Sequence, residues 1–327
     1  SEMCIRDSIM SDHASKFEKI WIVACGTAYH AGLFGKDLFE KVLGVPVSVE
    51  LASEFRYREP IVGKNDLGIV ISQSGETMDT IAATELLKEN GSHVLALVNV
   101  VGSSLARMAD SVFYLHVGPE IGVASTKAYL GMLVSQLVLA KHWDSKNRLD
   151  VSFDEIAELP NLIDKTMACE DQIKEISEKI YKKNDIYFIG RGLDYALAAE
   201  GALKLKEISY LHAEALAAGE LKHGTLALIE EGTPVVVTAS QNHLLDKTTS
   251  NVQEVIARGA YVIAIGDSES EKLENISNDY VTLPDSNEIL TTVISIIPLQ
   301  FIAYHVANKN GQSIDQPRNL AKSVTVE

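Results

Sequence analysis

Short apolar runs alternate along the chain with longer stretches whose apolar residues have helical spacing. In the first half, the runs that predict strands cover residues 20–24, 67–72, 94–99 and 111–116, and the predicted helices extend to about residue 43 and cover residues 77–90 and 125–143. Successive strands that are separated by helices form parallel sheets, because each connection must cross back over the sheet. The pattern therefore predicts an α/β fold in which helices cover both faces of a parallel sheet.

The same alternation begins again in the second half of the chain. Two stretches recur there, with residues 186–192 similar to 21–26 and residues 235–240 similar to 69–74. A constant offset of 166 residues aligns three pairs of residues without a gap, namely Gly26 with Gly192, Tyr29 with Tyr195 and Ser74 with Ser240. Similarity at a fixed offset predicts an internal duplication, and hence two similar α/β domains.

The chain divides at the points where this pattern changes. The expected segments are an unmatched leader or linker remnant at 1–16, a first domain at 17–150, a connecting segment at 151–183, a second domain at 184–312 and a C-terminal tail at 313–327. The connecting segment is polar and predicts one charged helix from Asp154 to Tyr181. The leader fits no element and has no apolar stretch of the kind found in signal peptides.

Composition narrows the classes of protein that fit. A chain of 327 residues with 46% hydrophobic residues is long enough for two folded domains. Its three cysteines have no metal-ligand spacing, which indicates a reducing compartment, and we expect the cytoplasm. The formal net charge of −16 argues against a nucleic-acid partner. The apolar run at 293–306 is too short to span a bilayer and contains Pro298 and His305, so we expect a buried helix and no membrane partner.

The loop from Ser72 to Thr77 follows a predicted strand and precedes a predicted helix. Its three hydroxyls, its glycine and its backbone N–H groups at a helix start are suited to binding a phosphate group. An ordinary strand-to-helix turn favours the same residue types, so this alternative remains open from the loop alone. In the second half the matching loop, residues 238–242, has lost the glycine and the threonine. We therefore expect one phosphate site per chain, in the first half.

Eight stretches of the chain, in order, resemble the isomerase part of the glutamine–fructose-6-phosphate aminotransferase (glucosamine-6-phosphate synthase) family. They are residues 25–27, 53–58, 72–77, 120–127, 204–209, 212–214, 219–224 and 315–327, and the resemblance covers the chain from about residue 17 to its end. The resemblance implies two tandem flavodoxin-like sugar isomerase (SIS) domains. It also implies a glutaminase domain, which we expect upstream of Ser1 in the complete protein. No metal or organic cofactor is expected.

Lys204 and Glu207 lie three residues apart on one face of a predicted helix. By themselves they favour a surface ion pair. The resemblance implies that Glu207 carries a proton between C1 and C2 of the sugar and that Lys204 assists it. Moving a carbonyl between these carbons needs such a base, together with donors that stabilise the developing oxyanion or enamine.

His223 and Lys322 gain a role only through the resemblance. A lone histidine is more often structural, although a pKa near about 6.5 suits proton transfer at neutral pH. The resemblance implies that His223 opens the sugar ring and reaches the site from a neighbouring subunit, which predicts a homodimer. A lysine in a polar tail is normally solvated. The resemblance implies that Lys322 forms a Schiff base with the open-chain ketone and that the tail closes over substrate as a lid.

The substrate-binding residues are also assigned by the resemblance. Those expected to bind the phosphate are Ser72, Gln73, Ser74 and Thr77, and those expected to bind the sugar are Cys25, Gly26, Thr27, Val123 and Ser125. Cys25 alone favours the interpretation as a small buried hydrophobic residue at a strand end. The implied reaction converts fructose 6-phosphate and ammonia, taken from glutamine in the complete enzyme, to glucosamine 6-phosphate in amino-sugar biosynthesis. Another SIS amino-sugar phosphate isomerase or deglycase, or a sugar-phosphate-sensing module, remains an alternative.

Overall fold

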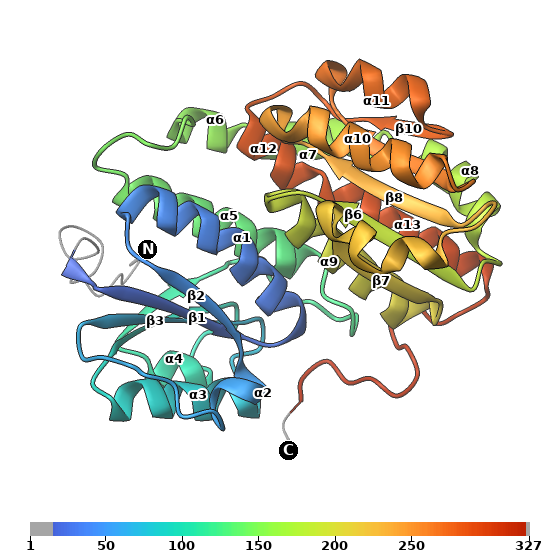
Figure 1. Cartoon of the computed structure of the whole chain (residues 1–327). Helices are drawn as coiled ribbons and strands as arrows, with labels where there is room; N and C mark the ends of the chain where they lie inside the picture. The colour runs from blue at the N-terminus through green and yellow to red at the C-terminus, as the bar shows by residue number, and fades with distance from the viewer. Residues whose placement is uncertain (1–15, 325–327) are drawn as a thin grey trace. The chain divides into compact units, whose positions relative to one another are not determined.

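The chain forms two compact units (Figure 1). The computed structural model describes residues 16–324, so residues 1–15 of the expected leader and the last three residues of the expected tail lie outside the described residues. The first unit contains the described residues up to Ile121, residues 125–150 and the segment from Ala321 onward. The second contains residues 122–124 and 151–320. The C-terminal end of the chain therefore returns to the first unit.

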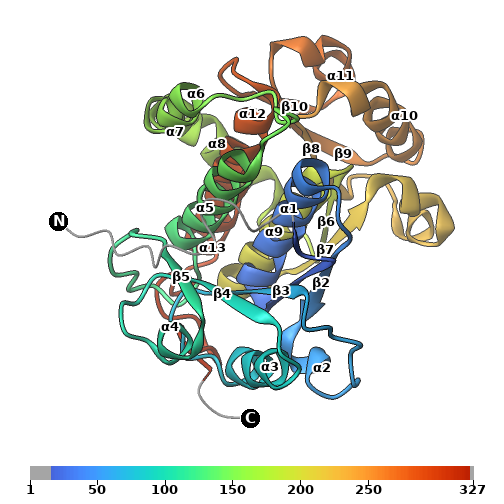
Figure 2. The same ribbon diagram turned by 90° about the vertical axis from the view of Figure 1, so that its left-hand side faces the viewer.

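The first unit is a parallel sheet of five strands with the order β2-β1-β3-β4-β5. Its strands are β1 (Lys19–Ala24), β2 (Val47–Leu51), β3 (Asp66–Ser72), β4 (His93–Val98) and β5 (Ser111–Tyr114). Its helices are α1 (Gly26–Leu43), α2 (Ala52–Phe55), α3 (Met78–Glu89), α4 (Ser104–Met108) and α5 (Lys127–Trp143). Figure 2 shows α1 and α5 on one face of this sheet and α2, α3 and α4 on the other. The prediction of a covered parallel sheet is confirmed.

Burial on both faces explains why the strands are apolar throughout. Every residue of β3, the central strand, is buried. Trp21 and Val23 pack in one cluster with Leu87 of α3, while Ile22 lies against Gly32 of α1. Alternate residues of β1 thus enter the two layers of core, as the pleat of a strand requires.

The second unit repeats this arrangement with the strand order β10-β9-β8-β6-β7. Its strands are β6 (Asp185–Gly190), β7 (His212–Ala217), β8 (Pro234–Ala239), β9 (Tyr261–Gly266) and β10 (Asp279–Thr282). Its longer helices are α9 (Leu193–Ser209), α10 (Leu245–Ile256) and α13 (Ile296–Lys309), and its shorter helices include η2 (Ala218–His223), α11 (Glu271–Ile276) and α12 (Glu288–Ile294). Read from β7, the order matches that of the first sheet, and both are the flavodoxin-like order. The predicted duplication is therefore confirmed.

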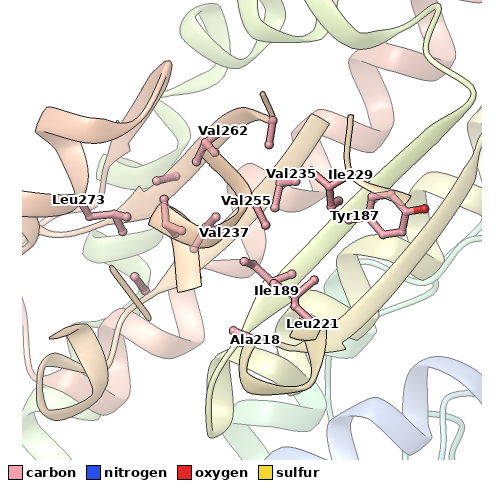
Figure 3. Packing of buried hydrophobic residues seen from close by; sticks show 14 residues of the cluster. Tyr187, Ile189, Ala218, Leu221, Ile229, Val235, Val237, Val255, Val262 and Leu273 are labelled. Atoms are coloured by element: carbon pink, nitrogen blue, oxygen red, sulfur yellow. The ribbon is translucent and has the colours of Figure 1, made fainter. Parts of the chain in front are cut away.

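A cluster of buried side chains joins β6 and β8 to the elements that cover one face of the second sheet (Figure 3). Val235 and Val237 of β8 pack with Val255 of α10. Ala218 and Leu221, both fully buried, belong to the same cluster and lie in η2. This cluster therefore fixes the short segment that ends at His223.

The connecting segment differs from the prediction. Instead of one helix from Asp154 to Tyr181, it forms α6 (Phe153–Ala157), α7 (Leu159–Met167) and α8 (Glu170–Ile180). Pro160 stands in the first turn of α7, where its missing N–H is tolerated but a continuous helix from α6 is not. The isoleucines of α8 are buried, and α8 packs against α13. Residues 151–183 are therefore part of the second unit.

The apolar run at 293–306 lies in α12 and α13, which are separated at Ser295. Within the described residues, 288–309 is the segment long and apolar enough to cross a membrane, with a mean hydropathy of 1.7. However, 78% of its apolar window is buried inside the structure. This burial is typical of the core helix of a globular domain, in agreement with the prediction of a buried helix.

Candidate functional site

The loop from Ser72 to Thr77 lies at the carboxyl end of β3, where α3 begins. From β1 the chain continues to β2 on one side of it, and β3 then lies on its other side. The strand order therefore reverses between β1 and β3, and sheets of this type bind ligands at the carboxyl ends of the strands at such a switch point. The Ser72 hydroxyl accepts a hydrogen bond from the Gly75 N–H (3.0 Å), and the Ser74 hydroxyl accepts one from the Glu76 N–H (3.2 Å). These bonds hold the loop in a tight turn.

Gly75 is required by this turn for two reasons. Its φ of +68° lies in the left-handed region, and a Cβ atom there would lie 2.2 Å from the Ser103 hydroxyl. Within residues 16–324, the N–H groups of Ser74 and Thr77 have no hydrogen-bond acceptor. The Thr77 side chain precedes α3 without capping it, and its hydroxyl lies 3.4 Å from that of Ser72. The loop therefore offers hydroxyl and N–H donors at a helix start, which is the arrangement that binds phosphate.

The end of the chain lies on this loop. The hydroxyls of Ser323 and Ser74 are 3.2 Å apart, and the Val324 carbonyl accepts a hydrogen bond from the Met78 N–H at the start of α3 (3.3 Å). Lys322 Nζ donates to Ser125 Oγ (3.1 Å) and to Glu120 Oε2 (2.6 Å). The first unit thus brings the predicted phosphate loop, the predicted sugar-binding Ser125 and the predicted amine together.

Glu120 is a residue of this site that the sequence did not single out. Its Oε1 accepts from the N–H groups of Thr126 (2.9 Å) and Ala128 (3.2 Å), at the start of α5, while its Oε2 accepts from Lys322. Burial alone would raise the pKa of Glu120, but these hydrogen bonds outweigh it and hold the pKa below its ordinary value. Glu120 is therefore a charged anchor for the Lys322 ammonium.

Three further residues expected to bind sugar, Cys25, Gly26 and Thr27, directly follow β1. Cys25 is half-buried before α1, and its Sγ is 3.9 Å from the Thr80 hydroxyl. Burial raises the pKa of the Cys25 thiol, so the residue is a neutral thiol at neutral pH. Gly26 is exposed, has a φ of +53° and has no atom within 4 Å of where a Cβ would stand. The space around Gly26, at the carboxyl end of β1, is therefore open, and Thr27 beside it is half-buried.

Val123 is the one sugar-binding candidate outside the first unit. It lies in the segment 122–124, which belongs to the second unit, and its N–H donates to the Asp315 carbonyl (2.9 Å). Two residues later, Ser125 belongs to the first unit. The side chain of Gln73, the remaining phosphate-loop candidate, is half-buried, and its carbonyl accepts from the Asn99 N–H (3.2 Å).

The second unit contains the predicted proton-transfer residues on α9. Lys204 is 2% exposed at its side chain, and it forms ion pairs with Glu207 and with Glu200, whose Oε1 lies 3.4 Å from Lys204 Nζ. Burial alone would lower the pKa of Lys204, but the two carboxylates outweigh it and raise the pKa above its ordinary value. A simple surface ion pair is therefore the wrong interpretation, because the lysine is buried between two carboxylates.

Glu207 is the accessible member of this group. Its side chain is 22% exposed, whereas that of Glu200 is fully buried. A carboxylate that is exposed on one side and hydrogen-bonded to a buried ammonium on the other has the access and the charge partner that a general base requires. Glu200 was missed by sequence reasoning, although its position four residues before Lys204 on a helix was the available signal.

His223 is exposed at the end of η2. In the described part of the second unit, no hydrogen bond or ion pair joins it to Lys204 or Glu207. The role of His223 in ring opening therefore stays a prediction. Among residues 16–324, no group of three or more His, Cys, Asp and Glu side chains is arranged to hold a metal ion.

Comparison with known proteins agrees with this geometry. The SIS domain family model matches residues 14–141 and 179–308, one match for each sheet. The chain is 49% identical over 325 residues to a glutamine–fructose-6-phosphate aminotransferase of Clostridium tetani and 49% identical over 326 residues to that of Caldanaerobacter subterraneus. Each alignment covers 98% of this chain and 54% of the relative, so the chain spans about half the length of these curated relatives.

A solved structure shows the same similarity. The C-terminal domain of glucosamine-fructose-6-phosphate aminotransferase from Francisella tularensis superimposes with a TM-score of 0.88 at 41% identity. The alignment covers 95% of this chain and 89% of that one. The chain therefore belongs to the SIS-domain family, as a tandem pair of SIS domains that corresponds to the C-terminal half of glutamine–fructose-6-phosphate aminotransferases.

Proposed function

We propose that this chain is the isomerase half of a glucosamine-6-phosphate synthase and converts fructose 6-phosphate and ammonia to glucosamine 6-phosphate. The observation that carries the proposal is the contact of the C-terminal segment with the phosphate loop. It holds a primary amine, Lys322, beside Ser125 in the same unit as the loop. An amine next to a site for a sugar phosphate is the arrangement that Schiff-base chemistry on a phosphorylated ketose requires.

The proposed reaction begins at the phosphate loop. The phosphate of the substrate accepts hydrogen bonds from the hydroxyls of Ser72, Ser74 and Thr77 and from loop N–H groups, which fixes the sugar chain relative to Lys322. His223 transfers a proton to the ring oxygen as the ring opens. The exposed C2 ketone then reacts with the Lys322 amine, and water leaves as the imine forms.

Lys322 must lose a proton before it can attack the ketone, because an ammonium ion has no free electron pair. Glu120 Oε2, 2.6 Å from Lys322 Nζ, holds the ammonium beside Ser125, and the proton passes to solvent water before the amine attacks. Ammonia then replaces the lysine at C2 and releases its amine. Glu207 removes a proton from C1 and returns it to C2, so that the carbonyl appears at C1 and the amino group remains at C2.

The fate of the charge during proton transfer explains the buried lysine. Glu207 carries a negative charge before it takes the C1 proton and none afterwards, while Glu200 remains fully buried beside Lys204. The Lys204 ammonium stabilises both carboxylates while Glu207 is charged, and it still pairs with the buried Glu200 carboxylate after Glu207 has taken the proton.

The proposal extends to the partners and location of the protein. We infer a homodimer in which His223 acts on the substrate bound to the neighbouring chain, and a glutaminase domain that supplies ammonia in the complete protein. We also infer a cytoplasmic location, since the spacing of the three cysteines is typical of a reducing compartment. The exposure of His223 supports the first of these inferences, because an exposed histidine on a fixed segment is available to a second subunit.

The test is product formation by the purified chain with fructose 6-phosphate and an ammonium salt. Glucosamine 6-phosphate should form, and Lys322→Arg, which keeps the charge but cannot form an imine at neutral pH, should abolish it. Conversion of fructose 6-phosphate to glucose 6-phosphate without amination would favour the alternative of a simple SIS isomerase. Binding of the sugar phosphate with neither product would favour a sensing module.

A further inference from the structure

The loop after β8 in the second unit corresponds to the phosphate loop, and its donors are already occupied. The Ser240 N–H donates to both oxygens of the Asp194 carboxylate (3.2 and 3.1 Å), and the Ser240 hydroxyl donates to Asp194 Oδ1 (2.6 Å). The Asn242 N–H donates to Glu288 Oε2 (2.9 Å). The N–H groups of Ser240 and Asn242 therefore bind carboxylates of the chain itself.

Asp194, which accepts most of these hydrogen bonds, is fully buried. Asp194 is 1% exposed and stands in the first turn of α9, the helix that follows β6. Burial is the main cause that raises the pKa of Asp194, to about 6, and the hydrogen bonds from the loop oppose it. At neutral pH the residue is therefore a buried anion whose charge is compensated mainly by the loop donors.

The first unit has no carboxylate at the position that corresponds to Asp194. Gly26 and Gly192, which are 166 residues apart, have φ angles of +53° and +54°, so the two turns have the same conformation. The same offset places Ala28 where the second unit has Asp194. In the first unit the side chain is a methyl group, and the N–H of Ser74 has no acceptor within residues 16–324.

We propose that Asp194 is a built-in anion that closes the loop of the second domain to sugar phosphates, so that the duplication yields one substrate site per chain. The carboxylate satisfies the loop donors and joins the loop to the first turn of α9, as a bound phosphate would do in the first unit. A phosphate dianion that approached this loop would meet a buried negative charge and N–H groups that are already bonded. The inference rests on the proposed function only in taking the first loop as the phosphate site.

A reciprocal exchange of the two side chains tests this inference. Asp194→Ala should open the second loop, and Ala28→Asp should close the first. Inorganic phosphate is the probe, and amide NMR spectra of the full chain during titration give the readout for each loop separately. In the wild type, phosphate should shift the signals of the Ser74 loop alone, whereas in Asp194→Ala it should also shift those of Ser240 and Gln241.

The closing exchange has a matched control. Ala28→Asp should weaken phosphate binding at the first loop more than about tenfold. Ala28→Asn adds a side chain of nearly the same size as aspartate but without the charge, so it should weaken phosphate binding by a smaller factor. Asp194→Ser is the second opening variant if Asp194→Ala does not fold, since its hydroxyl still accepts from one N–H of the loop. Circular dichroism establishes that each variant is folded.

The outcomes separate this inference from the proposed function. Phosphate shifts at Ser240 and Gln241 in a folded Asp194 variant support the inference, and their absence in both opening variants overturns it. If phosphate shifts neither loop of the wild type, the phosphate assignment of the first loop fails. The spectra of the Asp194 variants still decide whether a carboxylate closes the second.

Discussion

Removing two hydroxyls from the phosphate loop should weaken substrate binding without unfolding the protein. Ser74→Ala together with Thr77→Val deletes two donors to the phosphate. Thr77 makes no capping hydrogen bond to α3, and the Ser74 hydroxyl is half-buried and bonded to Ser323 and to the Glu76 N–H. The folded state therefore loses bonds that water can replace, and its stability should fall by no more than about 1 kcal/mol.

The effect on binding is larger because the ligand is a dianion. Hydrogen bonds to charged groups contribute about 1.5–3 kcal/mol each. Two of them give at least about 3 kcal/mol, which corresponds to a loss of about 10²-fold in affinity for fructose 6-phosphate. Calorimetric titration measures this loss, and fructose without the phosphate should bind poorly to both forms.

The matched control is Ser240→Ala with Asn242→Ala in the second loop. The buried Ser240 hydroxyl donates to the Asp194 carboxylate at 2.6 Å, so its removal should lower the free energy of unfolding by about 1–3 kcal/mol. Affinity for fructose 6-phosphate should remain nearly unchanged. The first double variant should therefore lose mainly affinity, and the second should lose mainly stability. Equal losses of affinity from the two loops would refute the assignment of the phosphate to the first unit.

The remaining predictions concern proton transfer, subunits and pH. Glu207→Gln should lower turnover by roughly 10²–10⁴ with little change in sugar phosphate binding, and near-normal turnover in steady-state kinetics would sink its role as the base. A mixture of His223→Ala and Glu207→Gln chains, each inactive alone, should regain partial activity when subunits exchange; mixed dimers without activity would count against a shared site. Because the folded-state pKa of Asp194 is raised from 3.8 to about 6, its contribution to stability is present in full below about pH 3.8 and is lost as pH rises through about 6. That loss amounts to about 3 kcal/mol. Asp194→Asn, which does not titrate, should therefore gain stability relative to the wild type as the pH rises from about 4 to about 7 in urea unfolding; a difference that does not change with pH would contradict this.

The strands and the duplication were predictable because their signal is local. Burial on both faces makes β1, β3 and β4 apolar throughout. The repeat is visible because one constant offset of 166 residues aligns Gly26 with Gly192 and Ser74 with Ser240. The edge strand β2 was not predicted, since only Val47 of its residues is buried and its pattern is correspondingly weak. The prediction of a single connecting helix was wrong because Pro160 prevents a continuous helix from α6 into α7, although the composition around it is helical.

The partners of the site residues were not predictable because they lie far apart in the sequence. Lys322 and Glu120 are 202 residues apart, and Ser240 and Asp194 are 46 residues apart. Only the fold brings each pair together. Neither Glu120 nor Asp194 differs in its local sequence from an ordinary surface carboxylate near a helix start. The burial of Lys204 was equally hidden, because a lysine and a glutamate three residues apart are common on exposed helices.

Trapping the imine tests the central claim most directly. The full chain is incubated with fructose 6-phosphate and a borohydride, which reduces an imine to a stable amine, and the modified peptide is identified by mass spectrometry. We predict one reduced sugar phosphate adduct per chain, on Lys322, that is lost in the Ser74→Ala and Thr77→Val double variant. An adduct on another lysine, or an adduct on Lys322 that forms equally well in the double variant, would contradict it.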